Sequence, residues 1–372
     1  MKVLLLTVTA GYGHTQAAKA IMGYLEEHDV ECTLLDTLDY INPVLGESVD
    51  KGYLYSIKFT PHMYGKIYDL ADNRDKADGK FSIYNVMNKI LSKKLTTFLE
   101  NYKPDVVVCT HIFAAQIVSY LQRKNIIKAN TIGIITDFTV HPFWEETDLD
   151  YYVTANELLN NQASKKGIGL QKILPTGIPI DPKFGQRVNS SKARYMLNIE
   201  DKTTILLMSG STGYGDIESI IMDMDKMDMD FQIISVCGNN KRLKKRIDGL
   251  ITRKRIYNLG FVDNIHIIMD ASDCIVTKPG GLTISESLAK RIPIILINPI
   301  PGQEERNAEF LLNNGSAIMS SETYPVDEAI YELMNSPLRR RHLQEMAEGI
   351  GRPNATENLG KAIISNTFVT FT

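Results

Sequence analysis

The sequence has no long apolar run and no strong excess of charge of either sign. Its 372 residues include 41 Lys and Arg against 44 Asp and Glu, so the formal net charge of −3 gives no general case for a nucleic-acid partner. No apolar stretch approaches the ~20 residues that a membrane-spanning helix needs. The apolar run at residues 2–8 is too short for a signal peptide, so we expect a cytoplasmic protein.

Cysteines are also few. Cys32, Cys109, Cys237 and Cys274 each lie in or next to a predicted strand, and none is part of a CxxC motif. Buried free thiols are therefore expected rather than disulfides or a metal site.

Short apolar strand patterns alternate with amphipathic helix patterns along the chain, which predicts an α/β protein with doubly wound parallel sheets. The length exceeds what one core usually supports, and a segment rich in Pro and Gly at 173–182 separates two halves. We predict domains at 1–175 and 176–350, with 351–372 returning to the first, and a ligand cleft at the carboxyl ends of both sheets. Strands are predicted at 2–9, 31–36, 105–110, 130–136, 151–154, 204–208, 231–237, 256–259, 274–277 and 294–297.

The first strand runs into Gly-Tyr-Gly-His at 11–14, and a helix pattern follows over 15–27. Free N–H groups and the helix dipole at such a turn attract developing negative charge. His14 at the helix start should have a lowered pKa, which favours the neutral imidazole that can act as a base. The alternative is a tight turn with a surface histidine. The helix should bury one face, formed by Ala17, Ala18, Ile21 and Leu25.

Polar loops containing glycine follow successive strands of the second half, at 208–216, 258–262, 277–286 and 299–307. Small residues at such turns let the backbone close around a phosphate, and the first loop does not match an NTPase P-loop. Glu286 could accept two hydrogen bonds from a ribose diol, and Lys278 could neutralise phosphate or have a structural role. Together the loops predict a nucleoside-diphosphate ligand.

Two segments carry an unusual mixture of residues. An insertion at 40–103 has many aromatic side chains and ten Lys or Arg against seven Asp or Glu, which suits either a membrane headgroup layer or a helical lid. The run 241–255 holds eight basic residues against one acid, as a solvated helix face does; contact with anionic lipid is the alternative.

Four segments together resemble the diacylglycerol glycosyltransferases of glycosyltransferase family 28. They are TVTAGYGHTQAAKAI, TDFTVHPFWEETDLDYYVTANE, GFV and TKPGGLTISESLAKRIPIILINPIPGQEERNA, and the resemblance spans nearly the whole chain. It implies a GT-B fold, with two Rossmann-like domains facing across a cleft. It also implies inverting, metal-independent transfer of a hexose from a UDP-sugar to diacylglycerol, without a further cofactor, by an enzyme peripheral to the anionic inner face of the cell membrane. Glucose is expected ahead of galactose, although no residue pattern decides between them.

The resemblance also implies residue roles. His14 would be the general base, Phe261 and Val262 would contact the uracil, and Glu286 would hold the ribose. Asp137 and His141 would lie near the cleft without an assigned role. The resemblance assigns the remaining contacts to the UDP-sugar to Gly13, Ser209, Gly210, Ser211, Thr212, Gly213, Gly280, Gly281, Leu282, Thr283, Gln303 and Glu304. Of these, Gln303 and Glu304 would contact the hexose.

Alternatives remain at this stage. The triplets 223–225 and 228–230 (both Asp-Met-Asp) imitate a metal-binding motif of other glycosyltransferases, but they precede a strand and are expected to form a solvated acidic face. A UDP-sugar epimerase of the same fold would have little need for the aromatic insertion. A non-catalytic UDP-sugar sensor at the membrane would tolerate the loss of His14.

Overall fold

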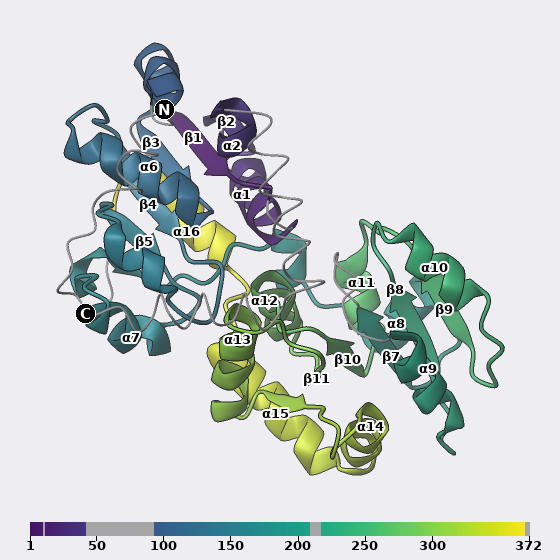
Figure 1. Ribbon diagram of the computed structural model, residues 1–372. Helices are drawn as coiled ribbons and strands as arrows, with labels where there is room; N and C mark the ends of the chain where they lie inside the picture. Colours follow the sequence, from purple (N-terminus) through teal and green to yellow (C-terminus); the bar gives the residue numbers. More distant parts are fainter. Residues whose placement is uncertain (10–11, 42–92, 209–216, 369–372) are drawn as a thin grey trace. The chain divides into compact units, whose positions relative to one another are not determined.

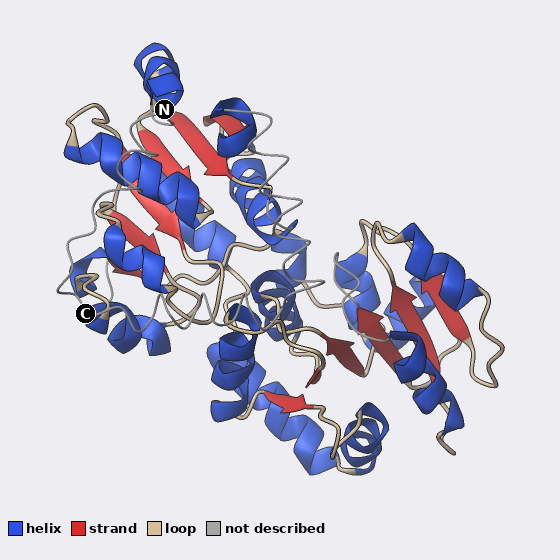
Figure 2. Cartoon of the chain, in the orientation of Figure 1, coloured by secondary structure: helices blue, strands red, loops and turns tan. Residues whose placement is uncertain are grey.

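The computed structural model describes residues 1–9, 12–41, 93–208 and 217–368 (Figures 1 and 2). Most of the predicted aromatic insertion and the loop 209–216 lie outside the described residues. Contacts divide the chain into two units, Met1–Pro182 with Asn354–Thr372, and Lys183–Pro353. The division falls at the end of the segment rich in Pro and Gly.

The first unit is built on a parallel sheet in the order β2-β1-β3-β4-β5-β6. Its central strands are almost wholly buried because helices cover both faces, which explains their continuous apolar sequences. Its strands are β1 Lys2–Thr7, β2 Glu31–Asp36, β3 Val106–Cys109, β4 Asn130–Ile134, β5 Tyr151–Val153 and β6 Ile173–Leu174.

Helix α1 (Tyr12–Glu26) packs against α16 (Ala355–Ser365), so the end of the chain belongs to the first unit. The α1 face predicted from the sequence is confirmed, since Ala17, Ala18, Ile21 and Leu25 are all fully buried. Residues 93–102 are also helical. Other helices of this unit are α2 Thr37–Ile41, α6 Ile112–Arg123, α7 Asn160–Lys165 and the short 3-10 helices η1 Pro142–Glu146, η2 Glu157–Leu159 and η3 Leu170–Lys172.

The second unit contains a second parallel sheet, in the order β12-β11-β10-β7-β8-β9. Its strands are β7 Thr204–Met208, β8 Gln232–Val236, β9 Ile256–Leu259, β10 Cys274–Thr277, β11 Ile294–Leu296 and β12 Ala317–Met319. Its helices are α8 Ser190–Met196, α9 Ile217–Lys226, α10 Lys241–Asp248, α11 Ile265–Asp270, α12 Gly281–Lys290, α13 Gln303–Asn313, α14 Val326–Asn335 and α15 Pro337–Ile350, and η4 Pro182–Gly185 joins the two units in sequence.

The predicted doubly wound α/β architecture is confirmed, and all ten predicted strands are present with ends within two residues. The short strands β6 and β12 were not predicted. All four thiols are free, and three of them are buried. No helix in the described ranges is both long and apolar enough to cross a bilayer.

A buried ion pair between Lys290 and Asp270 connects helices α12 and α11 of the second unit. The ammonium of Lys290 lies 2.7 Å from Asp270 Oδ2, and both side chains are almost fully buried. The same carboxylate oxygen accepts a hydrogen bond from the Val188 N–H at 3.2 Å. Because removing one partner would leave an unpaired charge in the core, this pair ties α12, α11 and the chain entering the unit together.

The packing of α16 on α1 predicts a specific overpacking effect. A Cβ added to Gly360 would lie 2.2 Å from Tyr24 Cδ1, whereas one added to Gly349 in α15 would meet nothing within 4 Å. We therefore expect Gly360→Ala to lower the free energy of unfolding by about 1–3 kcal/mol in urea titrations. The control Gly349→Ala should leave it unchanged or raise it by up to about 1 kcal/mol. Equal effects of the two substitutions would contradict the close α1–α16 contact.

Candidate functional site

His14 lies in the first turn of α1 and is oriented by two neighbouring strand ends. Its Nδ1 is 2.8 Å from the Thr110 carbonyl oxygen, which follows β3, and 3.0 Å from Thr136 Oγ1, which follows β4. A carbonyl oxygen only accepts, so Nδ1 carries the proton and donates it to Thr110. The lone pair is then on Nε2. This is the tautomer that can accept a proton from a bound hydroxyl group.

The environment keeps this imidazole neutral. Burial lowers the pKa of His14 to about 4, and the hydrogen bond to the Thr110 carbonyl opposes the shift only in part. The lowered pKa predicted from the sequence is therefore confirmed, but its main cause is burial, where the prediction relied on the helix start. At neutral pH the ring is in its free-base form.

Two more histidines lie at this edge of the sheet, and sequence reasoning missed the first of them. The His111 ring is 4.6 Å from the His14 ring in an edge-to-face arrangement and is 8% exposed. Its Nδ1 accepts the Phe113 N–H at 3.2 Å and so caps α6, which puts its own proton on Nε2. Burial, together with His14 and His141, holds its pKa well below the usual range. The sequence does contain a signal for His111, because this histidine lies between the pattern of a strand and the pattern of a helix.

His141 caps η1 in the same way, with Nδ1 accepting the Phe143 N–H at 3.1 Å. Asp137 precedes it in the same loop and is partly exposed.

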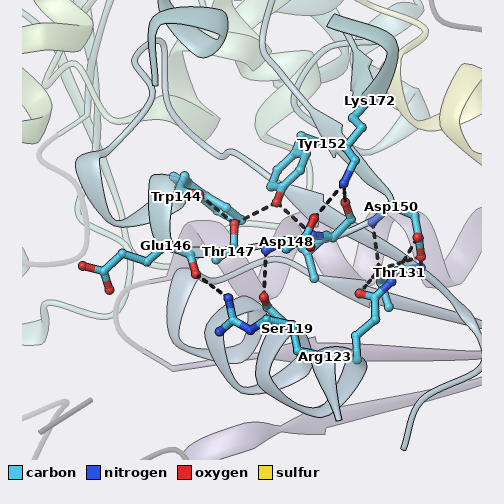
Figure 3. Close-up of polar contacts among 12 residues, drawn as sticks. Ser119, Arg123, Thr131, Trp144, Glu146, Thr147, Asp148, Asp150, Tyr152 and Lys172 are labelled. Atoms are coloured by element: carbon cyan, nitrogen blue, oxygen red, sulfur yellow. Dashed lines mark hydrogen bonds and ion pairs between the residues drawn. The ribbon is translucent and has the colours of Figure 1, made fainter. Parts of the chain in front are cut away.

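A hydrogen-bond network fixes the segment that follows His141 (Figure 3). The Thr147 hydroxyl donates to the Trp144 carbonyl at 2.7 Å, and the Tyr152 hydroxyl lies 2.9 Å from Thr147 Oγ1. Because the Thr147 proton is already used, Tyr152 is the donor to Thr147. Tyr152 Oη also accepts the Leu149 N–H at 2.9 Å. A buried phenol therefore holds both ends of the loop.

The two acids at the end of this loop are structural. Asp148 pairs with Lys172 at 2.7 Å, and Asp150 Oδ2 accepts from both the N–H and the hydroxyl of Thr131 at 2.8 Å. The Asp148 N–H in turn donates to Ser119 Oγ at 2.7 Å. All these bonds connect the loop to β4, α6 and η3 (Figure 3).

The second unit gathers glycine turns at the carboxyl ends of its strands. Gly280 is the N-cap of α12 after β10, and Gln303 begins α13 after β11. These two strands are neighbours in the sheet, with Thr277 paired to Leu296, so the two turns adjoin. Asn307 Nδ2 donates to the Pro279 carbonyl at 3.0 Å and connects α13 to the α12 turn. Asn307 is fully buried, and sequence reasoning gave it no role.

Glu304 lies against the α12 turn. Its Oε2 accepts the Ile300 N–H at 2.8 Å, and a Cβ built on Gly280 would be 3.9 Å from its Oε1. Burial raises the pKa of Glu304, and the nearby Lys278 ammonium opposes this shift. Burial likewise lowers the pKa of Lys278, with Glu304 opposing. The residues predicted for the hexose and for the diphosphate therefore adjoin, with one buried cation beside them.

Not all predicted donor residues are brought together. Phe261 and Val262 follow the edge strand β9, which β7 and β8 separate from β10, and Phe261 is 66% exposed. Leu282, Thr283 and Glu286 lie on α12 and are partly exposed. Gly13 lies in the first turn of α1, in the other unit. Residues Ser209 to Gly213 lie outside the described residues.

The acidic triplets are only in part the solvated face predicted for them. Asp225 is 6% exposed, and its Oδ1 accepts the Lys254 N–H at 2.8 Å, so the prediction is wrong for this residue. Asp228 and Asp230 are exposed, and Asp230 pairs with Lys202 at 3.1 Å. Across the described ranges there is no group of three or more His, Cys, Asp or Glu able to hold a metal ion.

The geometry at His14 predicts its titration. We expect ¹⁵N spectra of histidine-labelled protein to show a neutral Nδ1–H tautomer that protonates only near pH 4, against about 6.5 for free imidazole. Loss of these signals in His14→Gln would assign them. An Nε2–H tautomer, or protonation near pH 6.5, would contradict the Thr110 hydrogen bond.

Comparison with known proteins identifies both halves of the chain. Residues 14–180 match the family Monogalactosyldiacylglycerol (MGDG) synthase, and residues 204–359 match the Glycosyltransferase family 28 C-terminal domain. A processive diacylglycerol beta-glucosyltransferase of Bacillus pumilus (strain SAFR-032) is 27% identical over 374 residues, covering 98% of this chain and 95% of that one. One from Bacillus cereus (strain AH187) is 28% identical over 381 residues, covering 99% and 94%.

Solved structures share the fold at low sequence identity. Acinetobacter baumannii MurG matches with a TM-score of 0.61 and 14% identity over 98% of this chain and 99% of that one. The UDP-GlcNAc 2-epimerase from Neisseria meningitidis, bound to UDP-GlcNAc, matches with a TM-score of 0.64 and 15% identity over 98% and 100%. The calicheamicin glycosyltransferase CalG4 matches with a TM-score of 0.65 and 11% identity over 98% and 97%. The fold is therefore GT-B. Its two matched domains and its relatives along almost the whole length show that the chain belongs to glycosyltransferase family 28, among the diacylglycerol glycosyltransferases.

Proposed function

We propose that this enzyme transfers a hexose from a UDP-sugar to the hydroxyl group of 1,2-diacylglycerol, with inversion at the anomeric carbon, to give a β-glycosyldiacylglycerol. The observation that carries the proposal is the His14 tautomer, in which Nε2 holds the lone pair beside the first-unit sheet edge. We propose glucose as the sugar, because the relatives matched along the whole chain are named glucosyltransferases.

In the proposed reaction, His14 Nε2 takes the proton of the acceptor hydroxyl as its oxygen attacks the anomeric carbon. The bond from that carbon to the diphosphate breaks, UDP leaves with the electron pair, and the proton on Nε2 passes to water. A base with a pKa of about 4 does not remove a hydroxyl proton in advance, so proton transfer accompanies bond formation. General-base assistance of this kind contributes about 10² to 10⁴ in rate.

The donor is proposed to bind at the carboxyl edge of the second sheet. The Gly281 N–H at the α12 start would hold the diphosphate, whereas the Gly280 N–H donates to the Lys278 carbonyl at 2.9 Å and would shape the turn. The Lys278 ammonium would add positive charge beside it. One preorganised hydrogen-bond donor to a developing negative charge stabilises the transition state by roughly 3 kcal/mol. Ser209 to Gly213 are proposed to complete this cradle.

The sugar and nucleoside contacts complete the proposed donor site. Gln303 and Glu304 at the α13 start would bind the hexose hydroxyls, Glu286 the ribose, and Phe261 with Val262 the uracil. We propose that the first unit receives the lipid and that the enzyme is peripheral to the inner face of the cell membrane.

The decisive experiment is product analysis with diacylglycerol vesicles, offering UDP-glucose and UDP-galactose separately. We expect a glycolipid with UDP-glucose and a fall in kcat of about 10² to 10⁴ in His14→Ala, without a comparable loss of UDP affinity. His28→Ala is the matched control, because His28 is exposed just beyond α1 and should leave the rate unchanged. An epimer or free sugar as the only product would contradict the lipid acceptor, and an epimer would favour the epimerase alternative. UDP binding without turnover would favour a sensor.

The Asn307 bridge predicts an effect on donor binding. In Asn307→Ala the Pro279 carbonyl loses its buried donor, at a cost of about 1–3 kcal/mol, and the α12 turn loses its connection to α13. We expect the Kd for UDP, measured by calorimetry, to rise about tenfold or more. Asn313→Ala is the control, since Asn313 Nδ2 makes a similar bond to the Glu309 carbonyl at 2.9 Å on the exposed part of the same helix. An unchanged Kd for UDP in Asn307→Ala would show that the Asn307–Pro279 hydrogen bond does not support donor binding.

A further inference from the structure

Helix α10 presents a cationic outer face at the edge of the second sheet, beside strand β9 (Figure 1). Leu243 and Ile247 are buried beneath it. The helical period places Lys241, Arg242 and Lys245 on the opposite side, and all three are exposed. Among the residues that the structure describes, these three side chains form no ion pair.

The other cations of this run are largely neutralised by neighbours. Lys244 lies 2.9 Å from Asp248, and Arg246 lies 2.8 Å from Glu218. Arg253 lies 3.8 Å from the buried Asp225 carboxylate. The uncompensated positive charge therefore concentrates on the α10 outer face in a chain whose net charge is −3.

Arg255, directly before β9, is a further exposed cation of this run. Its guanidinium lies 5.3 Å from the centre of the Tyr257 ring. An exposed guanidinium can bind an external anion through its N–H groups.

An apolar side chain is exposed in the loop that follows α10. Ile251, in the loop between α10 and β9, is 93% exposed. The loop is held by Lys254, whose ammonium donates to the Met227 and Met229 carbonyls at 2.8 and 2.6 Å and lies 4.3 Å from the centre of the Phe231 ring. Ile251 is thus presented from an anchored loop.

We propose that this surface docks on an anionic phospholipid membrane. The α10 basic face (Lys241, Arg242 and Lys245) and Arg255 would contact lipid phosphates, and Ile251 would enter the boundary between headgroups and acyl chains. An exposed aliphatic side chain within a basic run fits this boundary better than a single-stranded nucleic acid, for which aromatic stacking surfaces are expected. The inference goes beyond the proposed function and rests on it only in that a lipid acceptor brings the enzyme to a bilayer.

The charge component is tested by co-sedimentation with vesicles of phosphatidylcholine containing phosphatidylglycerol, without UDP-sugar or diacylglycerol. Each Lys or Arg near such a surface contributes roughly fivefold to binding, so we expect Arg242→Glu with Lys245→Glu to bind at least about tenfold more weakly than the wild type. The control Lys192→Glu with Arg341→Glu has the same change in net charge on exposed residues of α8 and α15 and should bind normally. Equal losses in both variants, or no loss in the first, would overturn the proposal.

The apolar component is tested with Ile251→Asn, for which we expect several-fold weaker vesicle binding. Leu338→Asn is its control, because Leu338 is 76% exposed on α15. Unchanged binding of Ile251→Asn would overturn insertion of this loop. A charge-reversed variant that loses affinity for single-stranded RNA at the same salt, but not for vesicles, would assign the face to nucleic acid. Thermal unfolding midpoints verify that each variant is folded, and because no sugar nucleotide is present, the result is independent of glycolipid synthesis.

Discussion

Parallel pairing of β1 with β3, and of β3 with β4, is the constraint on which the candidate catalytic centre depends. Parallel strands end at one edge of a sheet, so the Thr110 carbonyl and the Thr136 hydroxyl meet the first turn of α1 there. The Thr110 N–H donates to the Leu6 carbonyl at 2.9 Å, which continues the strand pairing up to this point. A backbone carbonyl held in this way cannot rotate out of position, and it therefore selects one tautomer of His14.

In the second unit, too, parallel strands end at one edge of the sheet, but different chemical groups meet there. The neighbouring strands β10 and β11 bring two helix starts together, where N–H groups point outward and one buried amide, Asn307, joins the two turns. The charged groups here, Lys278 and Glu304, are close enough to shift one another's pKa. One sheet edge thus presents a neutral imidazole, that of His14, with a lone pair that can accept a proton. The other presents N–H groups and a cation that suit a diphosphate.

Charge is distributed unevenly outside these edges. Asp225 is buried among Arg253 and Lys254 and has a structural role, although its sequence imitates a metal motif. The Asp225 carboxylate offsets the charge of Arg253, whereas the three cations on the outer face of α10 form no ion pair within the described part of the chain. In the membrane docking that we propose, this local field would hold the protein near anionic headgroups, while the near-neutral total charge would limit attraction to other polyanions.

The sequence by itself determined the α/β class, ten of the twelve strands that the structure describes, the buried face of α1 and the glycine turns, because buried parallel strands and strand-to-helix turns have local signatures. The strands β6 and β12 escaped prediction, since two or three residues carry no periodicity. Only the tertiary structure decided the chemistry between distant residues. The His14–Thr110 bond spans 96 positions, the Asn307–Pro279 bond spans 28, and His111 meets His14 through strand pairing. A local pattern does not specify which carbonyl a ring nitrogen will meet, because that depends on which strands are neighbours in the sheet.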